Sequence, residues 1–275
     1  MNLLLVFLVG LAIGSFLNVC IYRLPRGESI VHPRSRCPHC QAQIAAYDNI
    51  PLLSYLLLRG RCRYCRHPIA AFYPLVELAS ASLLLLLYLR YGLSPVGWRN
   101  AVFALLLLVL IVTDLRDRIL PDRVTLPGLV AGLLFSFWIP VGDGSAALLA
   151  RLAGWDAPAW LRSFGDAVLG AAVWAALFYS VGELFYRVKR IEGLGLGDVK
   201  MVALLGAFLG LKLTLVTILF ACLLGIVLGG LYMLLRRTGT RYALPLGTFL
   251  GLAGLVALFW GPSLLRLYIS LFTLP

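Results

Sequence analysis

Long runs of apolar residues, each close to the length that crosses a lipid bilayer, recur along the chain. A transmembrane helix needs about 20 predominantly apolar residues. Soluble domains average about 25% charged residues, whereas only 13% of this chain is charged and 61% is hydrophobic. The sequence therefore predicts an all-α polytopic membrane protein with about eight transmembrane helices, at residues 1–22, 72–90, 99–113, 124–140, 164–187, 200–211, 213–235 and 245–262.

The distribution of Lys and Arg predicts the orientation of these helices. With the N-terminus outside, the segments facing the cytoplasm hold 18 of the 24 basic residues, and these segments are 23–71, 114–123, 187–200 and 236–241. Cytoplasmic loops are enriched in Lys and Arg, so we expect both termini to lie outside. This bias explains the net charge of +12 without a nucleic-acid partner. No charge precedes the first apolar run, which favours a retained helix over a cleaved signal peptide.

The long polar segment 23–71 carries two Cys-x-x-Cys pairs, which are Cys37 with Cys40 and, after 21 intervening residues, Cys62 with Cys65. Two such pairs at this separation are typical of a tetrahedral four-thiolate zinc site. A cytoplasmic location disfavours disulfides. We predict a small zinc-ribbon-like cytoplasmic loop domain in which zinc is structural, because four thiolates leave the metal no open position for catalysis.

Other interpretations of these residues remain open. The four cysteines could be free in a flexible loop, or one pair could have a redox role. His39 and His67 could replace a cysteine as ligands. Cys20 and Cys222 lie in apolar segments and are interpreted as packing residues.

Asp114 directly follows the apolar run 101–112, so it is expected inside the membrane or at its edge. A charge placed there is costly and is a candidate for function. Asp117 and Asp122 lie among Arg116, Arg118 and Arg123, where solvated pairing explains them. Asp122 could also cap the helix that follows.

Asp198 ends the segment Gly193-Leu194-Gly195-Leu196-Gly197-Asp198, just before the sixth apolar run. Alternating glycines allow backbone or substrate to approach closely. A helix N-cap is an equally simple interpretation of this aspartate. A phosphate-binding loop is less favoured, because the spacing matches neither the P-loop nor the dinucleotide-binding motif.

Asp114 and Asp198 are both expected at the cytoplasmic face. Two carboxyl groups that face each other in a low-dielectric site share one proton near neutral pH. The ionised group can deprotonate a water that attacks a peptide carbonyl, while the protonated group donates to the leaving amine. No Ser–His or Cys–His pair competes, because His32, His39 and His67 all lie in the cysteine loop.

These residues resemble the type IV prepilin peptidase family, also called leader peptidase/N-methyltransferase. The resemblance extends over nearly the whole chain. It rests on five matches in order: Gly14–Val19 with Ile21–Pro25, the paired cysteines with Arg59–Cys62, Tyr73–Leu78, Asp114 with Ile119–Asp122, and Gly195–Asp198 with Lys200.

The resemblance implies that Asp114 and Asp198 form the catalytic pair, that Asp117 and Asp122 do not, and that Gly195, Gly197 and Lys200 support the second aspartate. It implies a bacterial inner-membrane peptidase that removes the short basic leader of prepilins or pseudopilins on the cytoplasmic side. It also implies that the new N-terminus is methylated with S-adenosylmethionine.

The methyl-transfer site is less defined than the peptidase site. Gly60, Arg61 and Glu77 are candidates, although Glu77 could instead be an interhelical partner for Asn18. The expected domains are a first helix at 1–22, the zinc loop with the methyl-transfer region at 23–71, and the peptidase domain at 72–275. The outward insert 141–163 is longer than expected for the family.

Two other function classes remain. One is a cation-coupled transporter with a regulatory zinc loop, and the other is a non-enzymatic assembly factor. A transporter is expected to carry ionisable residues near the midplane of several helices, whereas here they gather at one face, which favours the enzyme. The sequence predicts neither the particular pilin substrates nor the oligomeric state.

Overall fold

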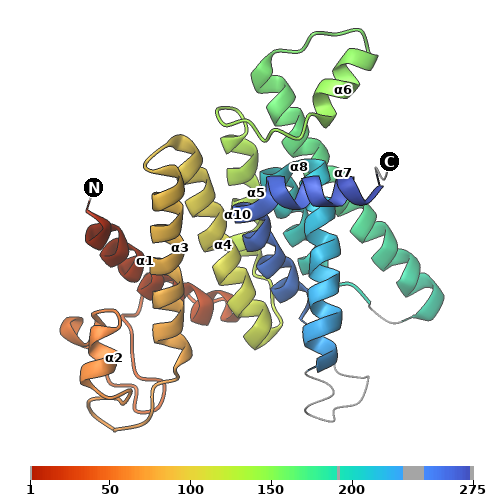
Figure 1. Cartoon of the computed structure of the whole chain (residues 1–275). Helices are drawn as coiled ribbons and strands as arrows, with labels where there is room; N and C mark the ends of the chain where they lie inside the picture. Colours follow the sequence, from red (N-terminus) through yellow and green to blue (C-terminus); the bar gives the residue numbers. More distant parts are fainter. Residues whose placement is uncertain (1, 191–192, 232–244, 273–275) are drawn as a thin grey trace. The chain divides into compact units, whose positions relative to one another are not determined.

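The computed structural model describes residues 2–190, 193–231 and 245–272 of the chain (Figure 1). The described residues are mostly helical and contain no β-strand beyond two isolated bridges. The chain divides into two compact units, Met1–Val109 and Leu110–Pro275. Each unit is considered by itself below.

In the N-terminal unit, helix α1 (Leu3–Arg23) packs on helix α3 (Phe72–Tyr91). Two glycines one turn apart form the contact. A Cβ on Gly10 would lie 2.5 Å from the Cα of Ala81, and one on Gly14 would lie 2.6 Å from the Cα of Glu77. The helix backbones therefore approach closely, as in the small-xxx-small packing that membrane helices use.

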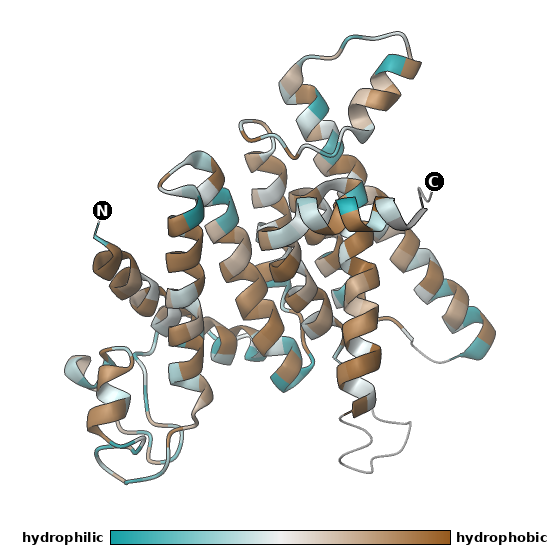
Figure 2. Ribbon diagram, in the orientation of Figure 1, coloured by the Kyte–Doolittle hydropathy of each residue, from teal (hydrophilic) through white to brown (hydrophobic). Residues whose placement is uncertain are grey.

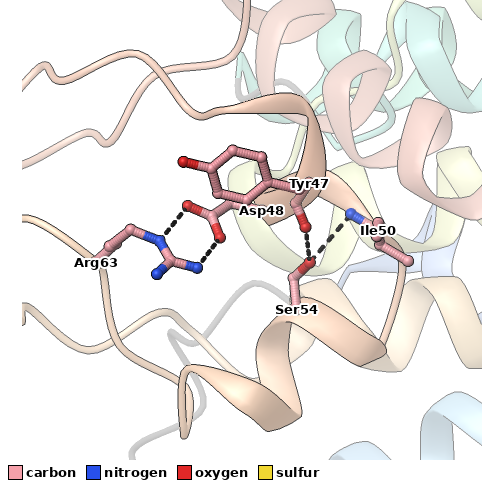
Figure 3. Close-up of polar contacts among 5 residues, drawn as sticks. All are labelled: Tyr47, Asp48, Ile50, Ser54 and Arg63. Atoms are coloured by element: carbon pink, nitrogen blue, oxygen red, sulfur yellow. Dashed lines mark hydrogen bonds and ion pairs between the residues drawn. The ribbon is translucent and has the colours of Figure 1, made fainter.

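Between α1 and α3 the chain forms a loop region with little regular structure. It contains η1 (Leu24–Arg26), η2 (Ala46–Asn49) and the short helix α2 (Leu53–Leu57). Polar contacts fold it (Figure 3): the Ser54 hydroxyl donates to Tyr47 O at 2.9 Å and accepts from Ile50 N at 3.1 Å. Such a loop needs another source of stability, because a segment this small cannot bury a sizeable core.

Helix α4 (Pro95–Asp117) passes from the first unit into the second. Within the described part of the C-terminal unit α4 is followed by α5, α6, α7, α8, η3 and α10, and α8 packs against α5, α7 and α10. Their bounds are α5 (Asp122–Phe135), α6 (Ser145–Leu152), α7 (Ala159–Lys189), α8 (Leu196–Leu224), the π-helical η3 (Gly225–Gly229) and α10 (Leu246–Phe272).

Gly210 divides α8 into two halves, because its φ of 77° and ψ of −176° are not helical. Helix α10 shows that the chain reverses there. A Cβ on Gly251 would lie 3.3 Å from Met201, and one on Gly225 would lie 3.5 Å from Phe249. Residues near both ends of α8 therefore lie beside the same part of α10, as in a hairpin.

Among the described residues, six helices are long and apolar enough to cross a membrane, namely Leu3–Arg26, Phe72–Tyr91, Pro95–Asp117, Ala159–Lys189, Leu196–Gly229 and Leu246–Ser270. Figure 2 shows apolar residues along these helices. The all-helical membrane fold predicted from the sequence is thus confirmed. The count differs from eight because α5 has only 14 residues and because the predicted spans 200–211 and 213–235 form one element bent at Gly210.

The insert 141–163 is tied to neighbouring helices by two aspartates. Asp166 of α7 accepts hydrogen bonds from Gly144 N at 2.9 Å and Ala146 N at 2.7 Å. Asp143 accepts from Lys212 N at 2.7 Å, and Lys212 Nζ donates to Asp143 O at 2.7 Å. These bonds satisfy amides at the start of α6 and just past the break in α8, so the insert has a structural role.

Candidate active site and metal centre

Asp114 lies in the last turn of α4 and is only 6% exposed. Its Oδ2 accepts two hydrogen bonds from Thr248, one from the backbone amide at 2.6 Å and one from the hydroxyl at 2.9 Å. Thr248 is in the first turn of α10, where backbone N–H groups have no partner within the helix. The carboxylate thus joins the end of α4 to the beginning of α10, and the α10 dipole favours its negative charge.

Asp198 lies in the first turn of α8, whose N-cap residue is Gly195. The interpretation of Asp198 itself as the N-cap is therefore wrong. Its carboxylate accepts a hydrogen bond from the backbone of Gly195, in the manner of the third residue of a capping box. A Cβ on Gly195 would lie 3.5 Å from Asp198 Oδ2, so the glycine gives the carboxylate room.

The structure brings the two aspartates to the same end of the C-terminal unit. Asp198 interacts electrostatically with Asp114. Leu120 lies between their segments: a Cβ on Gly197 would lie 3.1 Å from Leu120 Cβ, and one on Gly247 would lie 3.0 Å from both Leu120 Cδ1 and Asp114 Cγ. Glycines at 197 and 247 therefore allow the segments to close around the carboxylates.

Lys200, predicted to support the Asp198 loop, forms an ion pair with Asp122 of α5 at 2.6 Å. The pair connects the chain following Asp114 with the first turns of α8. Asp122 is the first residue of α5, and the N-cap is Pro121, so the capping role considered for Asp122 is not observed.

An apolar groove of about 580 Å³ lies between the second half of α8 and α10. Small residues line much of it, and the lining includes Leu246 and Phe249, the sequence neighbours of Gly247 and Thr248. The lining residues are Ala221, Cys222, Gly225, Ile226, Gly230, Leu246 and Phe249.

In the N-terminal unit, the four predicted metal ligands come together, with their sulfur atoms within 4.8 Å of one another. The Sγ atoms of Cys37 and Cys65 are 3.8 Å apart, and those of Cys40 and Cys62 are 4.0 Å apart. Zn–S bonds of about 2.3 Å in a tetrahedron place the sulfurs about 3.8 Å apart. The cluster therefore fits a four-thiolate zinc site.

The two halves of this cluster have the same backbone arrangement. In each, the backbone amide of the first cysteine donates to the carbonyl five residues later: Cys37 N donates to Ala42 O, and Cys62 N donates to His67 O, both at 2.9 Å. The residue after each second cysteine, Gln41 or Arg66, has a φ of 59°. Two turns of this kind present their sulfurs to one centre.

This similarity is visible in the sequence, where Arg36–Ala46 and Arg61–Ala71 share the pattern Arg-Cys-x-x-Cys-x-x-x-Ile-Ala-Ala. The cysteines were predicted to be metal ligands, but this repeat was not noticed in the sequence. Arg63, within the second knuckle, donates to both carboxylate oxygens of Asp48, at 2.7 and 2.6 Å (Figure 3). The Arg63 guanidinium holds the pKa of Asp48 below its ordinary value.

Backbone amides also favour the thiolate form at the second knuckle. The backbone N–H of Cys65 lowers the pKa of the Cys62 thiol to about 7. A thiolate, not a thiol, is the metal ligand, so the local backbone prepares this cysteine for metal binding.

The candidate methyl-transfer residues all belong to the N-terminal unit, and each has a structural contact. Gly60 has a φ of 66°, and Ile69 N donates to its carbonyl at 2.7 Å. Arg61 forms the isolated bridge with Pro68. Glu77 Oε2 accepts from Leu52 N at 2.9 Å.

The interhelical contact considered for Glu77 has different partners from those expected. Asn18 Nδ2 donates to Tyr73 O at 3.0 Å, while Glu77 also accepts from Ser15. The bonds Asn18–Tyr73 and Ser15–Glu77 join α1 to α3, and the bond Leu52–Glu77 joins the loop region to α3. These polar residues therefore stabilise the N-terminal unit.

Two residues near Asp114 were not predicted from the sequence: Thr248, which donates to it, and Gly247, where an added Cβ would lie 3.0 Å from Asp114 Cγ. The available signal was weak: Pro245 and Gly247 precede an apolar run, as at many helix starts. Nothing in the sequence at the start of α10 indicates that this helix faces the carboxylate of Asp114.

Comparison with known proteins agrees with this arrangement. Residues 8–91 match the bacterial peptidase A24 N-terminal domain, and residues 101–230 match the type IV leader peptidase family. No solved structure matches the chain.

Curated relatives match over most of their length. The prepilin leader peptidase/N-methyltransferase of Aeromonas hydrophila is 39% identical over 295 residues, covering 98% of this chain and 94% of that protein. The protein of the same name from Stutzerimonas stutzeri is 35% identical over 288 residues, covering 95% and 92%. That from Myxococcus xanthus is 42% identical over 236 residues, covering 86% and 64%.

These relatives are bacterial, and the chain has six helices able to cross a membrane. It is accordingly a multi-pass protein of the bacterial inner membrane. Nothing found supports the transporter alternative. On its match to the family and on identities of 35–42% to these relatives, the chain belongs to the type IV leader peptidase family.

Proposed function

We propose that this chain removes the short basic leader of prepilins or pseudopilins and then methylates the new N-terminus, with S-adenosylmethionine as methyl donor. The observation that carries the peptidase part is the approach of two carboxyl groups from helices distant in sequence, the buried Asp114 and the half-buried Asp198. Membership of the type IV leader peptidase family supports both parts.

In this mechanism the two carboxyl groups hold one proton between them, because like charges at close range in a low-dielectric site cannot both ionise cheaply. The ionised carboxylate takes a proton from a water molecule, whose oxygen attacks the carbonyl carbon of the scissile peptide. The protonated carboxyl group gives its proton to the leaving amine as the C–N bond breaks.

The surroundings suit a substrate whose cleavage site precedes an apolar helix. The groove, whose lining includes Leu246 and Phe249, is formed mainly by apolar and small residues. Small residues allow helices to pack closely within a membrane. We assign this groove to the apolar segment that follows the scissile bond.

We place the active site and the cysteine loop on the cytoplasmic side, with both termini outside, because 18 of the 24 Lys and Arg residues then face inward. The division into a helix at 1–22, a zinc loop at 23–71 and a peptidase domain at 72–275 remains part of this proposal.

Cys37, Cys40, Cys62 and Cys65 would hold one zinc ion, which supplies folding energy to a loop without its own core. Because four protein sulfurs complete the tetrahedron, the metal has no position for water. The peptide bond is therefore cleaved by the aspartates alone.

For methylation, Glu77 is the candidate that an experiment can separate from folding. Glu77→Gln keeps the size of the side chain and an oxygen acceptor for Leu52 N. If Glu77 takes part in methyl transfer, the variant cleaves prepilin normally but leaves the product unmethylated by mass spectrometry. Normal methylation would assign Glu77 to structure only. The same assay applies to Arg61→Gln and to Gly60→Ala, although strain is expected in the latter because φ is 66°.

The decisive test of the peptidase proposal compares Asp114→Asn and Asp198→Asn in purified, detergent-solubilised enzyme incubated with a prepilin. Each should lose cleavage by at least 10²- to 10⁴-fold, the range that general acid–base groups contribute. Asp117→Asn, one turn further along α4, is the matched control and should retain cleavage. Full activity in either of the first two variants would remove that residue from the mechanism.

A further inference from the structure

Thr248 gives Asp114 two donors on one oxygen. The amide and the hydroxyl of this single residue both bond Oδ2, at 2.6 and 2.9 Å. Thr248 is itself only 5% exposed, so these bonds are shielded from water. The other carboxyl oxygen of Asp114, Oδ1, accepts neither of these two bonds.

We propose that Thr248 is a positioning residue that fixes Asp114 and makes it the general base of the pair, so that Asp198 carries the shared proton. This inference rests on the proposed peptidase function. It assigns different roles to the two aspartates, the general base to Asp114 and the general acid to Asp198, whereas the proposed function does not distinguish them.

The hydroxyl distinguishes the two carboxyl groups. Asp198 lies in the first turn of α8, whereas Asp114 lies between the last turn of α4 and the first turn of α10, whose dipoles act on it in opposite senses, so helix dipoles do not select Asp114 as the charged group. The charge of Arg118 does favour an ionised Asp114. Each also accepts from a backbone amide, of Thr248 or of Gly195. Only Asp114 has an added hydroxyl donor among the hydrogen bonds of the described residues, and donors to a carboxylate favour its charged form.

The hydroxyl can also respond to the charge. Thr248 Oγ1 lies 2.9 Å from Asp114 Oδ2 and 3.4 Å from Ile111 O. A hydroxyl has one proton to donate, and a charged acceptor forms the stronger bond. It therefore points to Asp114 while the carboxylate is ionised, and it can turn to Ile111 O once Asp114 has taken a proton from water.

Orientation follows from the same contacts. Two bonds to Oδ2 from a rigid helix turn fix the plane of the carboxyl group. A base must lie within hydrogen-bond reach of the water it deprotonates, and small displacements are costly to catalysis. Thr248 thus keeps Oδ1 aimed at the position that water occupies.

The test compares Thr248→Val with Thr248→Ser in leader cleavage over a range of pH. Valine matches threonine in shape and keeps the backbone amide but removes the hydroxyl, whereas serine keeps the hydroxyl. We expect kcat to fall about 10- to 100-fold in Thr248→Val, the loss expected for one hydrogen bond to a charged group. We expect KM to be unchanged and Thr248→Ser to stay within a few-fold of the parent enzyme.

The pH profile separates this role from packing. Without the hydroxyl, Asp114 binds its proton more readily, so the acidic limb of the kcat profile should move to higher pH in Thr248→Val and stay in place in Thr248→Ser. Zinc content and detergent monodispersity equal to the parent would establish that both variants fold.

Three results would overturn the inference: a Thr248→Val enzyme with the parent's kcat and profile, a lower kcat with an unmoved acidic limb, or a Thr248→Ser enzyme as impaired as Thr248→Val. Failure of the underlying function is distinguishable, because it appears as cleavage by Asp114→Asn.

Discussion

The cysteine cluster and the aspartate site are built in opposite ways. Each cysteine knuckle is a local turn, closed by hydrogen bonds between residues five apart, such as Cys37 N to Ala42 O. The aspartate site joins Asp114, Asp198 and Thr248, which lie in three different helices. The hydrogen-bonded pair, Asp114 and Thr248, is separated by 134 positions in the sequence. The first is specified by spacing, and the second by how helices pack.

The two regions should therefore fail in different ways. Asp198→Asn is expected to lose cleavage by about 10²- to 10⁴-fold while keeping a full complement of zinc. Cys62→Ser is expected to lose zinc and the fold of the loop, because structural zinc supplies folding energy. Metal analysis and prepilin cleavage on both proteins make the comparison.

If the two regions are separate, Cys62→Ser must keep some cleavage activity. The pH profile of this residual activity must equal that of the parent enzyme. If the zinc-free protein instead cleaves as slowly as Asp198→Asn with a shifted profile, the cluster takes part in the chemistry and the two regions are not separate.

A smaller effect is expected from adding one methyl group at the glycines that close the site. The Cβ of Gly247→Ala would lie 3.0 Å from Asp114 Cγ. The atom nearest to the Cβ of Gly197→Ala would instead be Leu120 Cβ, at 3.1 Å. Overpacking of this kind costs about 1–3 kcal/mol, so we expect cleavage to fall about 5- to 100-fold. Gly247→Ala should be the worse of the two, because it displaces the carboxyl group itself.

Cleavage kinetics and zinc content on both variants test this ranking. Equal losses, or a greater loss in Gly197→Ala, would mean that the contact with Leu120, rather than the position of Asp114, sets the rate.

What could be predicted from the sequence follows the same division. That the four cysteines come together could be predicted because two residues between cysteines define a knuckle. Asp114 and Asp198 could be named as candidates because charges beside apolar runs are conspicuous, and the structure brings them together. Thr248 could not, because its role depends on α10 packing against α4, which no local pattern encodes. The hairpin at Gly210 was predicted as two spans, although not its glycine break.

The rate of zinc release from the loop should depend modestly on the ion pair between Arg63 and Asp48. Removing it with Asp48→Asn should speed zinc release to a chromogenic chelator, because Arg63 belongs to the second knuckle. The pKa of Asp48 is lowered in the folded loop, so its contribution is present above its unfolded pKa of about 3.9 and is lost only as the pH falls through the lower folded pKa.

Between pH 6 and 7.5 the carboxylate stays ionised, so the ratio of the two release rates should be constant while both rates rise as the thiolates are protonated. Rates that converge as the pH falls from 7.5 to 6 would show that Asp48 titrates in this range, and the proposed pairing would then be wrong.

The smallest effect is expected for the Lys200–Asp122 pair, which spans the aspartate site but is partly exposed, at 32% and 57% of the two side chains. Exposed ion pairs contribute about 0–1 kcal/mol, so the coupling in a double-mutant cycle of Lys200→Met and Asp122→Asn should correspond to less than about a five-fold change in cleavage. The coupling should shrink further in high salt, because screening weakens exposed charges. A larger, salt-resistant coupling would mean that this pair, like Thr248, holds the catalytic segments together, and that the site depends on more long-range polar contacts than on the close packing at Gly197 and Gly247.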